Sequence, residues 1–164
     1  MDNIILNQKG QVAIEYIVFI AIFLLFFQTA IKPSIDFAEN ILNDTYAIVE
    51  THNNIENLSQ TIEGFSNSLS YGTRTMFFYL PNNSKIIDCN NNGTIHFINY
   101  QIQISDTQPN PTTPDCNTTT DICTYSKQIF IGEKNLNCQP IGPGYSGPII
   151  LNKSQIGDIS VSIE

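Results

Sequence analysis

Few side chains in this chain have a type and spacing that could do chemistry. The two histidines, His52 and His96, are far apart in the sequence, and neither lies in a nucleophile or HExxH pattern. The sequence also lacks a glycine-rich phosphate loop. We therefore interpret both histidines as ordinary surface or edge residues, and we expect neither an enzymatic activity nor a cofactor.

The four cysteines are the second group of reactive side chains: Cys89, Cys116, Cys123 and Cys138. An even number of cysteines in a small exported domain is typical of two disulfides, for which three connectivities exist. We favour Cys116–Cys123, which closes a short loop, and Cys89–Cys138, which ties the first hairpin to later strands. The alternative of a zinc site is disfavoured, because there is no CxxC pair and the spacings do not suit zinc.

A calcium-binding loop is the second kind of metal site that a residue pattern in this chain partly matches. Asp115, Asn117, Thr119 and Asp121 alternate like the opening of such a loop. Its sixth position is not a glycine, however, and its twelfth is Ser126 where a glutamate is needed. We expect no bound metal.

Six asparagines stand in Asn-x-Ser/Thr sequons, the acceptors of N-linked glycans in exported proteins. Because the chain is rich in asparagine, some of these sequons are expected by chance. The six candidates are Asn43, Asn57, Asn82, Asn92, Asn117 and Asn152.

An apolar segment near the N-terminus decides where the rest of the chain lies relative to a membrane. Glu15 is the only formal charge between Lys9 and Lys32. As a helix, residues 11–31 span roughly 30 Å at about 1.5 Å per residue, enough to cross the hydrocarbon core of a bilayer. Ten strongly apolar residues between Ile17 and Phe27 each favour insertion by roughly 0.3–0.6 kcal/mol, which offsets the few kcal/mol that an ionised Glu15 costs.

The residues before this segment resemble a known processing signal. The sequence Gly10-Gln11-Val12-Ala13-Ile14-Glu15-Tyr16, followed at once by an apolar helix, is similar to the class III signal peptide of archaeal type IV pilins. The resemblance covers about the first twenty-five residues. Gln11, Glu15 and Tyr16 match the pattern of that family, while Ala13 stands where serine is usual. An ordinary secretory cut after Ala30 is disfavoured, because Gln28 occupies a position that needs a small residue.

The resemblance implies how the segment is used. Residues 1–10 would be a leader that a prepilin peptidase removes between Gly10 and Gln11, and residues 11–33 would be a membrane helix that becomes the filament core. Glu15, with Tyr16, would act in assembly by neutralising the N-terminal amine of a neighbouring subunit. Three alternatives stay open: pairing with the amine of its own chain, cyclisation of Gln11, or a Glu15 that is merely tolerated in the first turn of the helix.

The next residues predict an amphipathic continuation of this helix, over 34–71. An apolar residue recurs every seventh position, and Pro33 is expected to bend the helix where it leaves the membrane. Gly72 marks the end. The stripe consists of Ile41, Ile48, Ile55, Ile62 and Leu69, with Leu42, Val49, Leu58 and Phe65 beside it.

From residue 72 to the C-terminus the pattern changes to the alternation of β-strands. The chain is predicted to form about five strands in a small, mostly antiparallel sheet, which makes an α+β fold with a β-rich extracellular head. Asn92-Gly93 is a hairpin-turn signal, and 107–120 reads as a Pro- and Thr-rich loop. The predicted strands are 75–80, 85–88, 98–104, 127–131 and 159–163, with a turn-rich loop at 142–148.

Composition limits the partners. The net charge of −8 argues against nucleic acid and against an anionic membrane surface. With the resemblance, we expect a pilin that is inserted in the cytoplasmic membrane as a precursor and then polymerises into a surface filament for adhesion. Its partners would be copies of itself, the prepilin peptidase and the membrane platform that assembles the pilus. The alternatives are a minor pilin or pseudopilin, a membrane-anchored binding protein that does not polymerise, and an exported enzyme.

Overall fold

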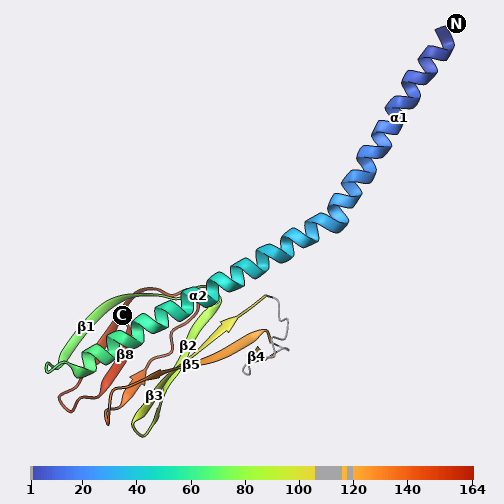
Figure 1. Ribbon diagram of the computed structural model, residues 1–164. Helices are drawn as coiled ribbons and strands as arrows, with labels where there is room; N and C mark the ends of the chain where they lie inside the picture. Colours follow the sequence, from blue (N-terminus) through green and yellow to red (C-terminus); the bar gives the residue numbers. More distant parts are fainter. Residues whose placement is uncertain (1, 106–115, 118–119) are drawn as a thin grey trace. The chain divides into compact units, whose positions relative to one another are not determined.

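The computed structural model describes residues 2–105, 116–117 and 120–164. It has the expected α+β fold, in which one long N-terminal helix precedes two mostly antiparallel sheets (Figure 1). The chain divides into two compact units, Met1–Leu42 and Asn43–Glu164.

The first unit is helical along its described length. It contains α1 (Asp2–Phe26), a five-residue π-helical turn η1 (Phe27–Ile31) and the beginning of α2 (Lys32–Asn67). In η1 the backbone N–H of Lys32 donates to the carbonyl of Phe27, five residues back. This π-turn ends two residues before Pro33, the residue at which a bend was predicted.

Proline chemistry explains the position of this turn. Pro33 has no N–H, and in a regular α-helix its ring would clash with the carbonyl four residues back. A π-turn widens the backbone there without ending the helix. Two hydroxyls add bonds to backbone carbonyls around it, Thr29 to Leu25 at 2.7 Å and Ser34 to Ala30 at 2.9 Å.

The second half of α2 belongs to the head and buries the predicted apolar stripe. Ile55, Leu58, Ile62 and Phe65 are at most 8% exposed, whereas Ile41, Leu42 and Val49, earlier in the helix, are exposed. The stripe thus covers the head core only in its later turns. Leu69 was predicted to complete it, which is wrong: α2 ends at Asn67, and Leu69 lies beyond it, fully exposed.

The end of α2 is fixed by two lysines of the head. The Lys153 ammonium donates to the carbonyls of Ser66 (2.9 Å) and Ser68 (2.5 Å), and the Lys134 ammonium donates to the Ser66 carbonyl at 2.6 Å. The last carbonyls of a helix have no partner within it, and cations suit this negative end. These contacts end the helix before the predicted boundary at 71.

The described residues of the head form eight strands, against about five predicted. They make two sheets, with the orders β1-β7-β8-β6 (sheet A) and β2-β3-β5-β4 (sheet B), and all pairs but β6–β8 are antiparallel. Their bounds are β1 Gly72–Tyr79, β2 Ser84–Asn92, β3 Ile95–Gln103, β4 Cys116–Asn117, β5 Ile122–Ile129, β6 Leu136–Cys138, β7 Ser146–Lys153 and β8 Ile159–Ile163.

The hairpin between β2 and β3 lies one residue from its predicted position. Asn92 pairs with Ile95, so the two loop residues are Gly93 and Thr94, and Asn92 ends β2. Gly93 has a φ of +65°, which glycine adopts without strain at the first position of such a turn. The predicted loop 107–120 lies largely outside the described residues.

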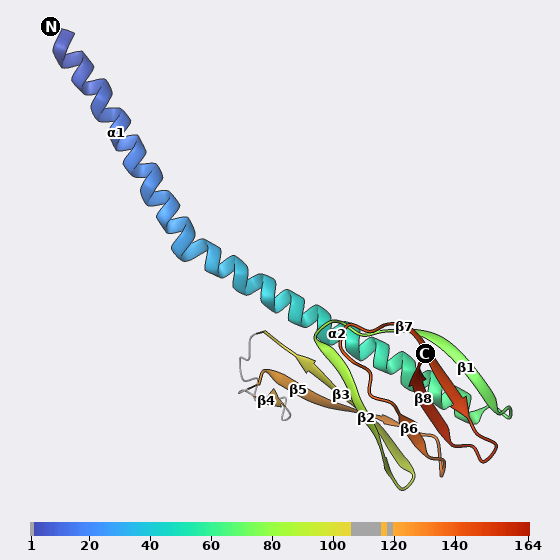
Figure 2. The ribbon, with the colours of Figure 1, turned by 180° about the vertical axis from the view of Figure 1, so that it is seen from behind.

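One hydrophobic core joins the head. It combines the buried face of α2 with inward-facing residues of both sheets. Figures 1 and 2 show the second half of α2 running alongside the strands of the head. The predicted alternation in β3 is confirmed, since Ile98, Tyr100 and Ile102 are buried. An isolated antiparallel bridge links Ile86 of β2 to Ile141, through two backbone hydrogen bonds of 3.0 and 3.1 Å.

Shortening a side chain of α2 that is buried in this core should destabilise the head. Leu58 is 0% exposed, so Leu58→Ala should lower the free energy of unfolding by about 3 kcal/mol through lost burial and a residual cavity. The measurement is urea unfolding of the full chain in detergent micelles, followed by tyrosine fluorescence. Leu42→Ala is the matched control on the same helix: Leu42 is 69% exposed, and its change should stay within about 0.5 kcal/mol. Equal losses for the two variants would contradict this placement of the core.

Candidate assembly segment

The predicted processing site lies inside α1. The backbone of Gly10 and Gln11 is helical, continuous with the residues on both sides. Helical geometry places Glu15 about one turn from Gln11, at the i, i+4 spacing. The structure thus brings these two positions onto neighbouring turns.

The residues that follow make a helix that is apolar on all sides and exposed. The large apolar side chains between Val12 and Phe27 are 41–69% exposed. Among the described residues one helix, Val12–Asn67, is long and apolar enough to cross a membrane. This is compatible with membrane insertion or with a signal sequence. A helix that is apolar all round is normally covered by protein or by lipid, so this surface requires a cover.

Glu15 and Tyr16 stand at the beginning of this apolar surface. Both side chains are exposed, and Tyr16 is 67% exposed. Near the other end, next to η1, lies a shallow hollow of about 570 Å³ that is lined mainly by apolar side chains and also by Glu39. Small side chains at Ala30, Ser34 and Ala38 contribute to this hollow.

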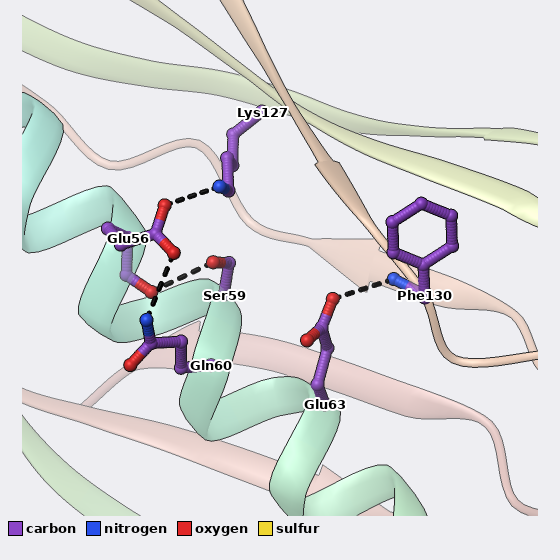
Figure 3. Close-up of polar contacts among 6 residues, drawn as sticks. All are labelled: Glu56, Ser59, Gln60, Glu63, Lys127 and Phe130. Carbon is purple, nitrogen blue, oxygen red and sulfur yellow. Dashed lines mark hydrogen bonds and ion pairs between the residues drawn. The ribbon is translucent and has the colours of Figure 1, made fainter.

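The head is held to α2 by polar contacts as well as by its core. Figure 3 shows Glu56 of α2 in an ion pair with Lys127 of β5. Glu56 also accepts from Gln60 at 3.0 Å, and Glu63 accepts from the backbone N–H of Phe130 at 2.9 Å. The hydrogen bonds from Lys127 and then from Gln60 lower the pKa of the Glu56 carboxyl. These contacts attach α2 to the end of β5.

The two histidines have different environments. His52 is exposed, as predicted; its Nδ1–H donates to the Ile48 carbonyl at 2.8 Å, and its ring meets Tyr100 and Tyr125 edge-on. For His96 the prediction of a surface or edge position is wrong, because it is 1% exposed.

The contacts of His96 are structural. Its Nδ1 lies 2.6 Å from the Asn91 side-chain oxygen on the paired strand, and its Nε2 lies 3.0 Å from the Gly132 carbonyl. Asn91 in turn bonds both the N–H and the carbonyl of Leu136. Sequence reasoning missed this group, because its members are brought together only by the folding of distant segments.

The stacked pair Tyr100–Tyr125 should make the head sensitive to high pH. Burial raises the pKa of Tyr100 to about 12, with Tyr125 and Glu56 adding to the effect. Between about pH 10 and pH 12 the unfolded state then loses a proton that the folded state keeps. The free energy of unfolding should therefore fall by about 2 kcal/mol as the pH rises through this window.

Denaturant unfolding at several pH values checks this expectation. Tyr100→Phe should remove most of this fall in the free energy of unfolding. The remaining pH dependence should come from Tyr125, whose pKa is also raised by burial. Tyr71→Phe is the control, because Tyr71 is 68% exposed. A Tyr100→Phe variant that keeps the full pH dependence would contradict the assignment.

Both favoured disulfides are confirmed. Cys89–Cys138 joins β2 of sheet B to β6 of sheet A, and Cys116–Cys123 joins β4 to β5. Of the positions that suggested a calcium loop, Asp115 and Thr119 lie outside the described residues. Among the residues that are described, no group of three or more His, Cys, Asp or Glu side chains gathers where it could hold a metal ion.

All six sequon asparagines are exposed, as a glycan acceptor must be. The six are Asn43, Asn57, Asn82, Asn92, Asn117 and Asn152. In two sequons the hydroxyl partner is buried: Ser59 donates to the Glu56 carbonyl and Ser84 to the Pro81 carbonyl. Modification of Asn57 and Asn82 would therefore have to precede folding of the head.

Comparisons with protein-family models, with curated proteins and with solved structures found no match to this chain. Its class is thus defined by its own residues: an α+β protein with an exposed, membrane-length apolar helix at its N-terminus and a disulfide-bonded β head.

Proposed function

We propose that this chain is a structural subunit of a type IV pilus-like surface filament, processed between Gly10 and Gln11 and polymerising through its N-terminal helix. The observation that carries the proposal is the exposed apolar surface from Val12 to Phe27, directly after the Gly10–Gln11 and Glu15–Tyr16 pattern of the processing signal. Lipid would cover this surface before assembly, and the helices of neighbouring copies would cover it in the filament.

Replacing lipid by neighbouring helices needs a driving force other than the burial of apolar surface. Lipid tails are as apolar as the helix, so association depends on close packing and on pairing of polar groups. Glu15 would supply the polar pairing, with the N-terminal amine of a neighbouring copy, since two charges that are each costly in an apolar core become tolerable together. The head would then form the outer surface of the filament, where it would serve adhesion, with the glycosylation candidates facing solvent.

Mass spectrometry of the mature N-terminus tests the proposal, on material sheared from the cell surface. A chain that begins at Gln11, or at its cyclised form, is the expected result. A chain that begins at Met1 and occurs only in membranes would indicate a fixed anchor instead. A chain that begins after Ala30 would indicate a secreted protein and would overturn the proposal.

A further inference from the structure

The outward face of sheet A carries a row of polar side chains across three neighbouring strands. Asn137 of β6 pairs with Ser160 of β8, and Ser160 pairs with Asn152 of β7. All three side chains are exposed, while their neighbours along each strand are buried. The three side chains therefore lie side by side on one surface, over the strands that Figure 2 labels β6, β8 and β7.

A half-buried carboxylate stands at the end of this row. Asp158 directly precedes β8, and its Oδ1 accepts from the backbone N–H of Asn135 at 2.9 Å and from the Asn135 side-chain amide at 3.2 Å. Its backbone carbonyl accepts from the N–H of Ser154 at 2.9 Å. Within the described residues the second carboxylate oxygen, Oδ2, makes no hydrogen bond. Asp158 is thus held in place through one oxygen, with the other available.

These residues line a recess of about 300 Å³, at the lower end of the range of about 300–1,000 Å³ that is usual for small-ligand pockets. No Lys or Arg contributes to its lining, so an anion is disfavoured. With a single carboxylate, the recess is also a poor match for Ca²⁺, which takes several charged oxygen ligands. Amides and hydroxyls can both donate and accept, which fits a neutral ligand that carries several hydroxyl groups.

We propose that this recess binds a neutral sugar with adjacent hydroxyl groups. Oδ2 of Asp158 accepts from one or two of these hydroxyls, while the amides of Asn137 and Asn152 donate to their oxygens and Ser160 completes the row. Within the described residues, the side chains of Asn137, Asn152 and Ser160 make no hydrogen bonds of their own, so binding breaks no internal contact. A single chain suffices for this binding, and it does not depend on the proposed function; repetition along a filament would add avidity.

Two sources could supply the sugar, because Asn152 is also a sequon asparagine. One is the chain's own glycan on Asn152, and the other is an external polysaccharide. The chemistry at Asp158 and Asn137 is the same for both. Native protein that carries a glycan on Asn152 and takes up no added sugar would identify the first source. Native protein with an unmodified Asn152 that does take up added sugar would identify the second.

The test uses the full chain, produced without glycosylation and held in dodecylphosphocholine, a detergent that contains no sugar. Methyl α-mannoside, galactose and N-acetylglucosamine are titrated separately, while NMR follows the side-chain amides of asparagine. We expect at least one of these sugars to shift the Asn137 and Asn152 signals with a dissociation constant on the order of 1 mM, the scale of a few net hydrogen bonds.

Three variants locate the site. Asn137→Ala/Ser160→Ala changes only outward-facing side chains, and it should weaken binding about tenfold or more, the equivalent of one or two hydrogen bonds. Asp158→Asn keeps the size of the side chain but loses the charge, and it should also weaken binding; a melting curve checks that the bonds to Asn135 survive. Asn90→Ala, an exposed asparagine of sheet B, should bind like the wild type. Failure of the wild type to bind any of the three sugars, or normal binding by the Asn137→Ala/Ser160→Ala variant, would overturn the proposal.

Discussion

Removing the disulfide between Cys89 and Cys138 should cost the head about 4 kcal/mol of its free energy of unfolding, because the bond closes a long loop in the unfolded chain. The two cysteines are 49 residues apart in sequence, and they join β2 of sheet B to β6 of sheet A. The double variant Cys89→Ala/Cys138→Ala should therefore unfold at a clearly lower urea concentration than the wild type.

The other disulfide provides an internal comparison. Cys116 and Cys123 are only 7 residues apart and lie within one sheet, so Cys116→Ala/Cys123→Ala should cost only about 2.5 kcal/mol by the same loop-closure argument. Urea midpoints of the full chain in detergent micelles give both values, and intact mass confirms that the remaining disulfide is formed. A larger loss for the 116–123 pair than for the 89–138 pair would contradict the loop-closure argument.

The membrane-length helix and the alternation in β3 could be predicted from sequence because each depends on local residues. An uninterrupted run of about twenty apolar residues predicts a membrane-length helix by its length alone. Alternation at Ile98, Tyr100 and Ile102 likewise predicts a strand with one buried face, and these residues are buried. Predictions of this kind need no knowledge of distant segments.

The strands β6 and β7 could not be predicted, for reasons that lie outside their own residues. The three residues of β6 are too few to show a period, and the strand is formed by parallel pairing with β8. The turn-rich loop predicted at 142–148 is wrong over its last three residues, because β7 begins at Ser146. Gly147 and Pro148 are turn-forming residues, which is why a turn was predicted there. The pairing with β8, however, begins only at Ile149, so Pro148 costs no hydrogen bond to β8.

Two further features depend on contacts that no local pattern records. The early end of α2 depends on Lys134 and Lys153, which are far along the chain. The burial of His96 depends on Asn91 and on the carbonyl of Gly132. The polar row of the proposed sugar recess was equally hidden in the sequence, because Asn137, Asn152 and Ser160 become neighbours only through strand register.

Neutralising Glu15 should abolish most filament assembly if the proposed function is correct. Glu15→Gln keeps the length and polarity of the side chain but removes its charge. The N-terminal amine of an arriving copy would then stay unpaired among apolar helices, at a cost of several kcal/mol per subunit. A loss of this size in each contact lowers the yield of sheared filament by at least about a hundredfold, since about 1.4 kcal/mol corresponds to a factor of ten.

The design separates assembly from processing. Immunoblots compare the sheared and membrane fractions, and mass spectrometry of the membrane fraction reports the N-terminus, which should still begin at Gln11. Asp36→Asn is the matched control, because Asp36 is an exposed acid of the same unit but lies outside the apolar run, and it should assemble normally. Glu15→Gln that is cut at Gln11 and still yields wild-type filaments would show that the charge is not needed for assembly. A chain that is no longer cut would instead place Glu15 in recognition by the peptidase. The failure to assemble would then say nothing about pairing, because a subunit that keeps its leader never offers the amine that Glu15 is proposed to pair with.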